Sequence, residues 1–256
     1  MKAVLEAIGR PVLRLLEGVG RFFELLGQTA YGLVRPPFAF ALTAKQVVRV
    51  GVDSVPVVFL TALFTGGVLA LQTFKGFQRF HAEGYIGSVV ALSMLRELGP
   101  VLTGLMVTGR AGSAMAAELG SMRVTEQIDA LVSLATDPVQ YLFVPRVLAS
   151  IIVAPMLVVL ADVTGILGGY LVAVQYLGAN PVVYMNNTFQ YLNMDDMTSG
   201  LIKAAVFGLL FSMIGCQTGY DTKGGAEGVG TSTTSAVVLG SLAILIADFF
   251  LTKVLF

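Results

Sequence analysis

Residues Ser93–Pro138, SMLRELGPVLTGLMVTGRAGSAMAAELGSMRVTEQIDALVSLATDP, decide the fold of this chain. The stretch begins apolar except for the adjacent pair Arg96 and Glu97, continues through a run of small residues, and ends in an acidic amphipathic piece. A charge inside a membrane costs at least about 2.5–3.5 kcal/mol on insertion scales, so the pair needs partners and the acidic piece must lie outside the lipid. We therefore expect one element that joins a polar spot within a membrane to a surface outside it.

The composition of the whole chain supports a membrane setting. Of 256 residues, 55% are hydrophobic and 12% are charged, about half the charged fraction of an ordinary globular protein. The chain is therefore predicted to be an integral membrane protein with a single domain, residues 1–256, because several spans of about 20 residues use most of its length. A net charge of zero gives no reason to expect nucleic acid, and the lone Cys216 excludes an internal disulfide.

The apolar pattern predicts an all-α membrane protein. Small residues that repeat every four positions at Gly112, Ala116 and Gly120 allow helix backbones to approach closely. The Gly- and Ser/Thr-rich stretch Gly224–Ser235 is interpreted as a link. The predicted elements are interfacial and elbow helices within residues 1–50, five transmembrane helices at 54–74, 85–109, 147–174, 199–219 and 236–255, and a cytoplasmic loop at 113–145.

The first 28 residues form an amphipathic pattern. Apolar residues such as Leu5, Ile8 and Val12 recur at helical spacing, with charged residues on the other side. Such a helix fits best lying in the membrane interface, and a soluble helix packed on a partner is the alternative. Basic residues concentrate before the first span and in the loops after spans two and four, which places the N-terminus in the cytoplasm and the C-terminus in the periplasm.

Charged residues recur inside the predicted spans at comparable depth. Because consecutive spans run in opposite directions, Arg96, Glu97, Asp162, Lys203 and Asp248 all fall at mid-membrane or in the outer half. Buried charges pair with one another, and we expect Glu97 and Asp248 to contact Lys203. The cluster Glu97, Asp162, Lys203 and Asp248 then either holds helices together or forms the polar wall of a substrate cavity, with Arg96 towards a headgroup.

Aromatic residues follow the first span. Phe74, Phe77 and Phe80 share a face beside Lys75 and Arg79. This pattern is typical of an aromatic belt with cations that reach the interface, and it also suits a mouth that holds acyl chains while the cations approach a phosphate.

Motifs for catalysis are missing. The sequence contains no GxxxxGK[ST] nucleotide loop, no HExxH zinc motif and no GxSxG nucleophile elbow. His81 is the only histidine, so no histidine pair can bind a metal, and we place it in a loop near the outer surface. Asp162 and Asp248 lack the motif residues of an aspartyl dyad. We expect no catalytic residue, no metal site and no cofactor in this chain.

The segment LRELGPVLTGLMVTGRAGSAMAAELGSMRVTEQIDAL, followed by DP at 137–138 and PR at 145–146, resembles the MlaE (YrbE-like) family of permeases. These are membrane subunits of lipid-trafficking ABC transporters that work with MCE-domain proteins. The likeness covers nearly the whole chain, including Lys203 and the region around Asp248.

The resemblance implies a non-catalytic subunit that moves phospholipid or a related lipid between a bacterial inner membrane and a periplasmic MCE-type carrier, maintaining outer-membrane lipid asymmetry. It implies a homodimer below a ring of MCE proteins, with two partner ATPases that bind ATP and Mg. A coupling helix at about Ser121–Leu131 would dock into the ATPase. The residues it assigns to coupling are Arg123, Glu126 and Asp129, and those it assigns to lipid are Leu69, Phe74, Phe77, Phe80, Arg96 and Glu97.

Two alternatives stay open at this point. The acidic segment could be a solvated loop instead of a docking helix. The protein could also be a self-sufficient channel or secondary transporter that uses Glu97, Lys203 and Asp248 as an ion or proton relay. The cytoplasmic segment discriminates between the two functions, because it needs a docking partner only in an ABC transporter.

Overall fold

The computed structural model describes residues 2–36, 39–80 and 82–255, and within the first helix the side chains of Leu13 and of residues 16–34. All regular structure in the described part of the chain is helical. The α-helices are α1 (Lys2–Val34), α2 (Phe40–Val50), α3 (Val55–Phe77), α4 (Ile86–Ser93), α5 (Gly99–Val107), α6 (Ser113–Val124), α7 (Gln127–Ser133), α8 (Val144–Tyr170), α9 (Pro181–Gln190), α10 (Met194–Tyr220) and α11 (Gly225–Leu255).

Five helical segments are long and apolar enough to cross a membrane, which confirms the predicted all-α membrane fold. They run over Phe40–Phe80, Glu83–Val124, Val139–Tyr176, Met194–Tyr220 and Gly225–Leu255. Each is longer than the apolar window from which it was predicted, because the helices continue beyond the hydrocarbon-length stretch at one or both ends. His81 and the side chains of Leu5, Ile8 and Val12, all named in the sequence interpretation, lie outside the described residues.

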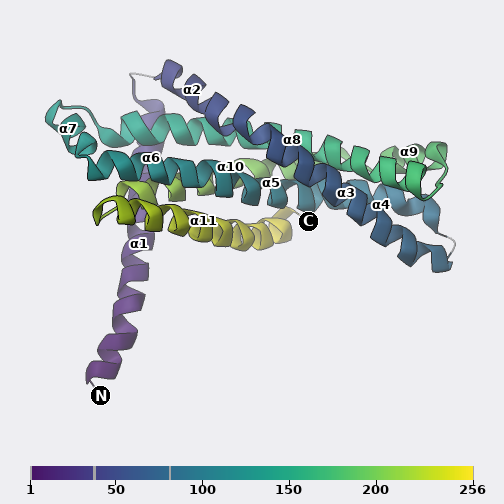
Figure 1. Ribbon diagram of the computed structural model, residues 1–256, viewed down its shortest axis with the longest axis horizontal. Helices are drawn as coiled ribbons and strands as arrows, with labels where there is room; N and C mark the ends of the chain where they lie inside the picture. The colour runs from purple at the N-terminus through teal and green to yellow at the C-terminus, as the bar shows by residue number, and fades with distance from the viewer. Residues whose placement is uncertain (1, 37–38, 81, 256) are drawn as a thin grey trace.

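The long helices form one elongated bundle with two distinct ends (Figure 1). The short helix α7 marks one end, called here the α7 end, and α9 marks the other, called the α9 end. Short π-helical turns interrupt the segments at Met94–Leu98, Thr108–Gly112, Val139–Phe143 and Leu171–Tyr176. Such turns are frequent at functional sites, and the first of them carries Arg96 and Glu97.

Helices α3 and α8 make the most extensive contact in the bundle, and glycine makes it possible. A Cβ atom built on Gly66 would overlap the carbonyl oxygen of Gly165, and one built on Gly168 would overlap the carbonyl oxygen of Leu63. Association in lipid depends on close packing, because lipid tails are as apolar as the side chains they replace. Backbone-to-backbone contact between α3 and α8 therefore anchors the first span to the third.

Helix α11 corrects one prediction. The stretch Gly224–Ser235, expected to be a link, forms the first turns of α11 from Gly225 onward. The hydroxyl groups of Thr231 and Thr233 donate to carbonyl oxygens three residues earlier, at 2.9 and 2.6 Å. Packing of α11 on α6 and α10 thus overrides the weak helix propensity of glycine, serine and threonine.

Helix α1 leaves the bundle at the α7 end and runs across the direction of the other helices (Figure 1). Its second half is fixed to the bundle: Leu25 and Thr29 are buried, and the Arg21 guanidinium lies 2.8 Å from Asp221 Oδ1. Leu16 and Phe23 stay exposed. A helix that lies in the membrane plane would take this direction, and the interfacial position remains a prediction.

Replacing Gly168 with alanine is expected to destabilise the bundle by about 1–3 kcal/mol, because the new methyl group must push the α3 backbone away. Cys216 is the only cysteine and is fully buried, so a thiol-reactive dye reports unfolding on heating in detergent. Gly76→Ala is the matched control, since a Cβ there would meet no atom within 4 Å. Equal melting temperatures for both variants would contradict the packing argument.

Candidate functional site

The candidate site is a polar cluster around Lys203. Lys203 lies on α10, the fourth span, and is completely buried, and its partners come from the second and fifth spans. The Lys203 ammonium lies 2.8 Å from Glu97 Oε2 and 3.0 Å from Asp248 Oδ1. It donates to the Arg96 carbonyl oxygen at 2.9 Å and to Thr252 Oγ1 at 2.7 Å. The structure therefore brings together Glu97, Lys203 and Asp248, the contact expected from their depth in the sequence.

The ammonium has fewer hydrogens than neighbouring oxygens. Two of its three N–H groups serve the Arg96 carbonyl and the Thr252 hydroxyl. Asp248 Oδ1 is close enough for an ion pair but is not aligned as a hydrogen-bond acceptor. Thr252 in turn donates to Glu97 Oε1 at 3.0 Å. The threonine therefore ties the carboxylate to the same ammonium through a second path.

The Lys203 cluster, here Glu97, Lys203, Asp248 and Thr252, contains two carboxyl groups for one ammonium. Lys203 is fully buried, whereas the Glu97 side chain is 38% exposed. The carboxylates thus form the open side of the cluster and the ammonium its closed side. A partner that covers this side needs polar groups at the same depth, because an uncovered carboxylate is costly in hydrocarbon.

Arg96 turns to a different partner. Its Nε donates to Asp196 Oδ1 at 2.6 Å, and Asp196 Oδ2 accepts from the backbone N–H of Asn193 at 3.0 Å. Asp196 is buried in the first turn of α10, where it forms a capping box with Asn193. The guanidinium therefore fixes the start of the helix that carries Lys203. The predicted contact of Arg96 with a lipid headgroup stays a prediction.

Asp162 corrects the predicted cluster, because it forms no described ion pair with Lys203. It lies on α8 where a Cβ on Gly99 would overlap its carboxylate. Its Oδ1 is buried without a hydrogen-bond partner among the described residues. The comparable depth of Asp162 was derived from span direction alone, and helix rotation, which depth does not fix, turns it towards α5.

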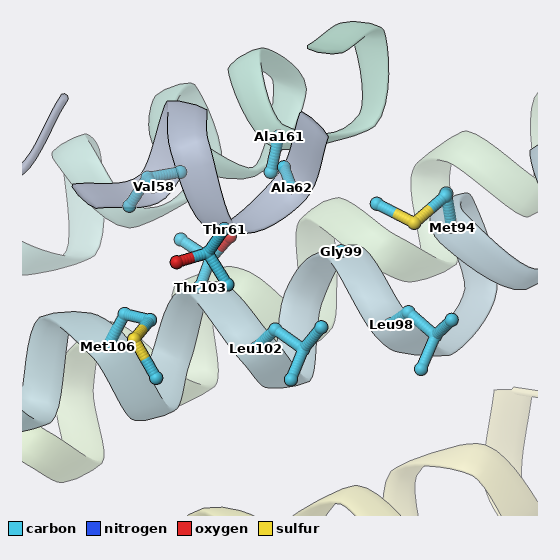
Figure 2. A pocket seen from close by; sticks show the side chains of 10 residues that line it. All are labelled: Val58, Thr61, Ala62, Met94, Leu98, Gly99, Leu102, Thr103, Met106 and Ala161. Carbon is cyan, nitrogen blue, oxygen red and sulfur yellow. The ribbon is translucent and has the colours of Figure 1, made fainter. Parts of the chain in front are cut away.

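A small cavity opens beside Gly99, between α3, α5 and α8 (Figure 2). Leu98 of the preceding π-helical turn and Leu102 and Met106 of α5 lie along it, and its volume of about 10 Å³ has room for roughly one water molecule. A phospholipid acyl chain does not fit in it.

The residues predicted to hold lipid are split by their burial. Leu69, Phe74 and Phe77 of α3 are partly buried and packed against the hydrophobic core, while Phe80 is 80% exposed beyond the end of α3. Their assignment stays a prediction.

The α7 end contains the predicted coupling segment in a different shape. Instead of one helix over Ser121–Leu131, α6 ends at Val124 and α7 begins at Gln127. Glu126 between them adopts a left-handed backbone conformation with φ of 59°, which is unfavourable for a residue with a side chain. The Arg123 guanidinium closes the hairpin by an ion pair of 2.8 Å with Asp129.

This hairpin is linked to α1 through the end of α10. The guanidinium groups of Arg123 and Arg21 lie 5.8 and 6.0 Å from the centre of the Tyr220 ring. Beside it, burial raises the pKa of Asp221, and the positive charges of Arg21, Lys223 and Arg123 counteract this shift.

Within the described residues no group of three histidine, cysteine, aspartate or glutamate side chains could hold a metal.

Comparison with known proteins shows to which family the chain is similar. Residues 43–254 match the model of a family described as Permease MlaE. The chain belongs to the MlaE permease family. A "Probable ABC transporter permease protein" of Rickettsia bellii is 50% identical over 255 residues, covering 99% of this chain and 98% of the relative.

Two further relatives have more specific names. The "Intermembrane phospholipid transport system permease protein MlaE" of Haemophilus influenzae is 38% identical over 255 residues, which cover 98% of this chain and 97% of the relative. The chloroplastic protein TRIGALACTOSYLDIACYLGLYCEROL 1 of Arabidopsis thaliana is 40% identical over 232 residues, covering 91% and 66% respectively. The chain is thus an ABC transporter permease of the MlaE family and a multi-pass membrane protein.

The sequence interpretation of this MlaE-family permease missed two residues of its polar interior. Asp196 was not singled out, although the spacing of Asn193 and Asp196 is that of a helix cap. Thr252 gave no signal, since a threonine near the end of an apolar helix is unremarkable by itself. Its role follows only from its distance to Lys203 and Glu97.

Replacing Lys203 with methionine is expected to cost about 3–5 kcal/mol of stability, because Glu97 and Asp248 would lose their shared cation. Adding Glu97→Gln and Asp248→Asn to this variant should restore much of the loss. Exposure of Cys216 to a thiol dye on heating measures both effects. A triple variant as unstable as Lys203→Met alone would show that lost packing, not unpaired charge, is responsible.

Proposed function

We propose that this permease moves phospholipid, or a related lipid, between a bacterial inner membrane and a periplasmic MCE-type carrier, and that this transport maintains lipid asymmetry of the outer membrane. The observation that carries the proposal is the near full-length match to a permease named for intermembrane phospholipid transport. In this proposal the chain is non-catalytic, and partner ATPases bind ATP and Mg.

The proposed lipid path lies between two copies of the chain. Helix α11 presents a long apolar surface that the single chain leaves uncovered, including Leu242, Leu245 and Phe249. The open side of the Lys203 cluster adjoins this helix, because Asp248 and Thr252 belong to it. A second copy would cover both the apolar surface and the carboxylates, and a lipid between the copies would meet apolar side chains and a polar wall. These features support a homodimer with lipid between protomers.

The α6–α7 hairpin is the proposed docking element for the ATPase. It lies outside the apolar part of the second span and has exposed acidic side chains at Glu126 and Asp129. It is joined to the third span by the Val139–Phe143 turn and α8. Closure of the partner ATPases would displace the hairpin, and the rigid helices would carry that displacement into the membrane.

Orientation follows from the same proposal. The α7 end would face the cytoplasm, in agreement with the excess of basic residues at the N-terminus and in the adjoining loops. The C-terminus and α9 would face the periplasm and the MCE ring.

A charge relay fits the Lys203 cluster less well than lipid transport. A relay through a fixed ammonium between two carboxylates would need further titratable groups leading to both membrane surfaces.

Reversing two charges on the hairpin tests the docking proposal. The variant Glu126→Arg with Asp129→Arg should lose the ATPase when tagged permease is purified from native membranes, because like charges would meet and Arg123 would lose its partner. Glu227→Arg, an exposed acidic position at the start of α11, is the control for a non-specific effect of charge. Retention of the ATPase by the double variant would remove the hairpin from the docking site.

Charged replacements test the lipid-binding prediction. Leu69→Asp and Phe77→Asp should each abolish co-purification of phospholipid, since a carboxylate at an acyl-chain contact is strongly unfavourable. Phe77→Leu, which stays apolar, should retain it. Lipid is quantified by mass spectrometry on monodisperse protein, so that misfolded material is excluded. Unchanged lipid content in the aspartate variants would show that these residues do not line the path.

A further inference from the structure

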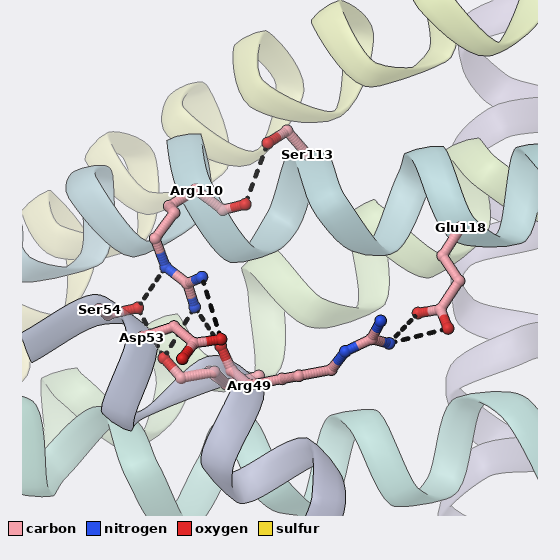
Figure 3. A network of polar contacts seen from close by, with 7 residues as sticks. Arg49, Asp53, Ser54, Arg110, Ser113 and Glu118 are labelled. Atoms are coloured by element: carbon pink, nitrogen blue, oxygen red, sulfur yellow. Dashed lines mark hydrogen bonds and ion pairs between the residues drawn. The ribbon is translucent and has the colours of Figure 1, made fainter.

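A second polar cluster, which shares no residue with the Lys203 cluster, joins the corner between α2 and α3 to the π-turn at Thr108–Gly112 and to α6 (Figure 3). It borders a pocket of about 190 Å³, called here the arginine pocket. Arg49 and Asp53 line it from the corner between α2 and α3, and Arg110, Ala114 and Glu118 line it from the π-turn and α6. Neither the family match nor the proposed transport path assigns it a role.

Two arginines and two carboxylates line the arginine pocket, and Arg146 behind it adds a third arginine. Glu118 accepts hydrogen bonds from Arg49 Nη1 at 2.8 and 2.9 Å, and it also forms an ion pair of 2.9 Å with Arg146 Nη2. Arg146 is buried and its ion pair already neutralises the charge of Glu118. Arg49 is therefore a second cation on the same carboxylate. The Arg49 side chain is 60% exposed. It can therefore serve another anion without leaving Glu118 unpaired.

Arg110 provides a fixed guanidinium on the other side of the pocket. Its Nε donates to Ser54 Oγ at 2.8 Å, and its Nη2 donates to the carbonyl oxygens of Arg49 and Val50. Nη1 lies 3.9 Å from Asp53 Oδ2, too far for a hydrogen bond. Three arginines thus face two carboxylates, and a planar guanidinium donor remains available for a phosphate oxygen.

The depth of the pocket matches that of lipid headgroups. Ser54 begins the uncharged segment 54–74, and Arg110 directly follows the apolar segment 85–109. The hydrogen bond between them joins two boundaries of the hydrocarbon region. Phosphate groups of a bilayer lie just beyond that boundary. The pocket is therefore placed where a lipid phosphate is present at high local concentration.

An apolar row continues from the pocket towards the centre of the bundle. Leu98, Leu102 and Met106 follow one another every four residues on α5 and its preceding turn, and they line the small cavity beside α3 (Figure 2). Arg110 and Ala114 follow at the same spacing and line the arginine pocket. One surface thus offers cations at its end and apolar side chains along its length, which is the pattern of a phospholipid.

We propose that the arginine pocket binds the phosphate of a membrane phospholipid whose acyl chain lies on the protein surface along the half-buried side chains of Met106 and Leu102, outside the small cavity. This lipid is distinct from the one in the proposed path between protomers. The site does not depend on transport: it would be occupied even in a permease with no ATPase attached.

The test measures binding of individual lipids to the full-length permease in detergent by native mass spectrometry. Dioleoylphosphatidylglycerol is compared with dioleoylglycerol, which has the same chains and no phosphate. Arg49→Gln should weaken binding of the phospholipid about ten-fold, the effect of losing a hydrogen bond to a charged group, and leave dioleoylglycerol unchanged. Asp53→Asn should strengthen it, since it removes a competing negative charge. Lys45→Gln, an exposed cation on α2 that does not line the pocket, is the matched control and should have no effect.

The outcomes separate this site from the proposed transport path. The effect of Arg49→Gln should persist in a Phe77→Asp background, where the path is blocked. Equal binding of the two lipids, or equal effects of Arg49→Gln and Lys45→Gln, would overturn the proposal. Competition by glycerol 3-phosphate as strong as that by the lipid would identify a free phosphate ester as the occupant and would overturn the lipid assignment. Opposite effects of Arg49→Gln and Asp53→Asn could not arise from misfolding.

Discussion

The ammonium of Lys203 constrains the whole permease, because a charge that is fully buried in a membrane protein must keep its partners. Glu97 comes from the second span and Asp248 from the fifth, while Lys203 belongs to the fourth. Removing the fourth span would leave both carboxylates without their cation in hydrocarbon, at a cost of several kcal/mol, and removing either of the others would take one partner from Lys203. The cluster therefore fixes the rotation and depth of three helices at once.

The remaining contact surfaces depend on shape. Helices α3 and α8 approach until the backbone of Gly66 touches that of Gly165, and α10 approaches α8 in the same way at Gly208 and Ser150. Such contacts hold without any polar group, because a small side chain allows many atoms of two helices to meet. The bundle thus combines one set of helices joined by charge with another joined by close packing, and α10 belongs to both.

The sequence predicted the fold and the centre of the site because both follow from one-dimensional constraints. Span number follows from apolar length, and the meeting of Glu97, Lys203 and Asp248 follows from their depth in spans of alternating direction. Asp162 was misplaced because depth does not fix the rotation of a helix. The break at Glu126 was missed because residues 121–131 contain no glycine or proline that would mark a turn.

The same limit explains what three-dimensional contacts add. The second partners of Lys203 are a backbone carbonyl and a threonine, and neither has a recognisable pattern in sequence. The carbonyl of Arg96 that accepts from Lys203 lies in the π-helical turn at Met94–Leu98. The sequence therefore predicts that the buried ammonium needs partners. Which groups accept its hydrogen bonds depends on the local geometry of the folded chain.

The two ends of the bundle differ in how firmly their polar groups are held. Around Lys203 every polar contact comes from within the spans, so the cluster can change only if whole helices move. At the α7 end, Arg21, Arg123 and Tyr220 connect α1, α6 and α10 through side chains that are partly exposed. Exposed charge contacts contribute little stability and rearrange at little cost. A displacement of the α6–α7 hairpin would therefore be absorbed first at this junction, and it would reach Lys203 only as a rigid movement of α10. This sequence of movements fits the proposed transporter, in which closure of the ATPases outside the membrane must move helices without exposing the charge of Lys203.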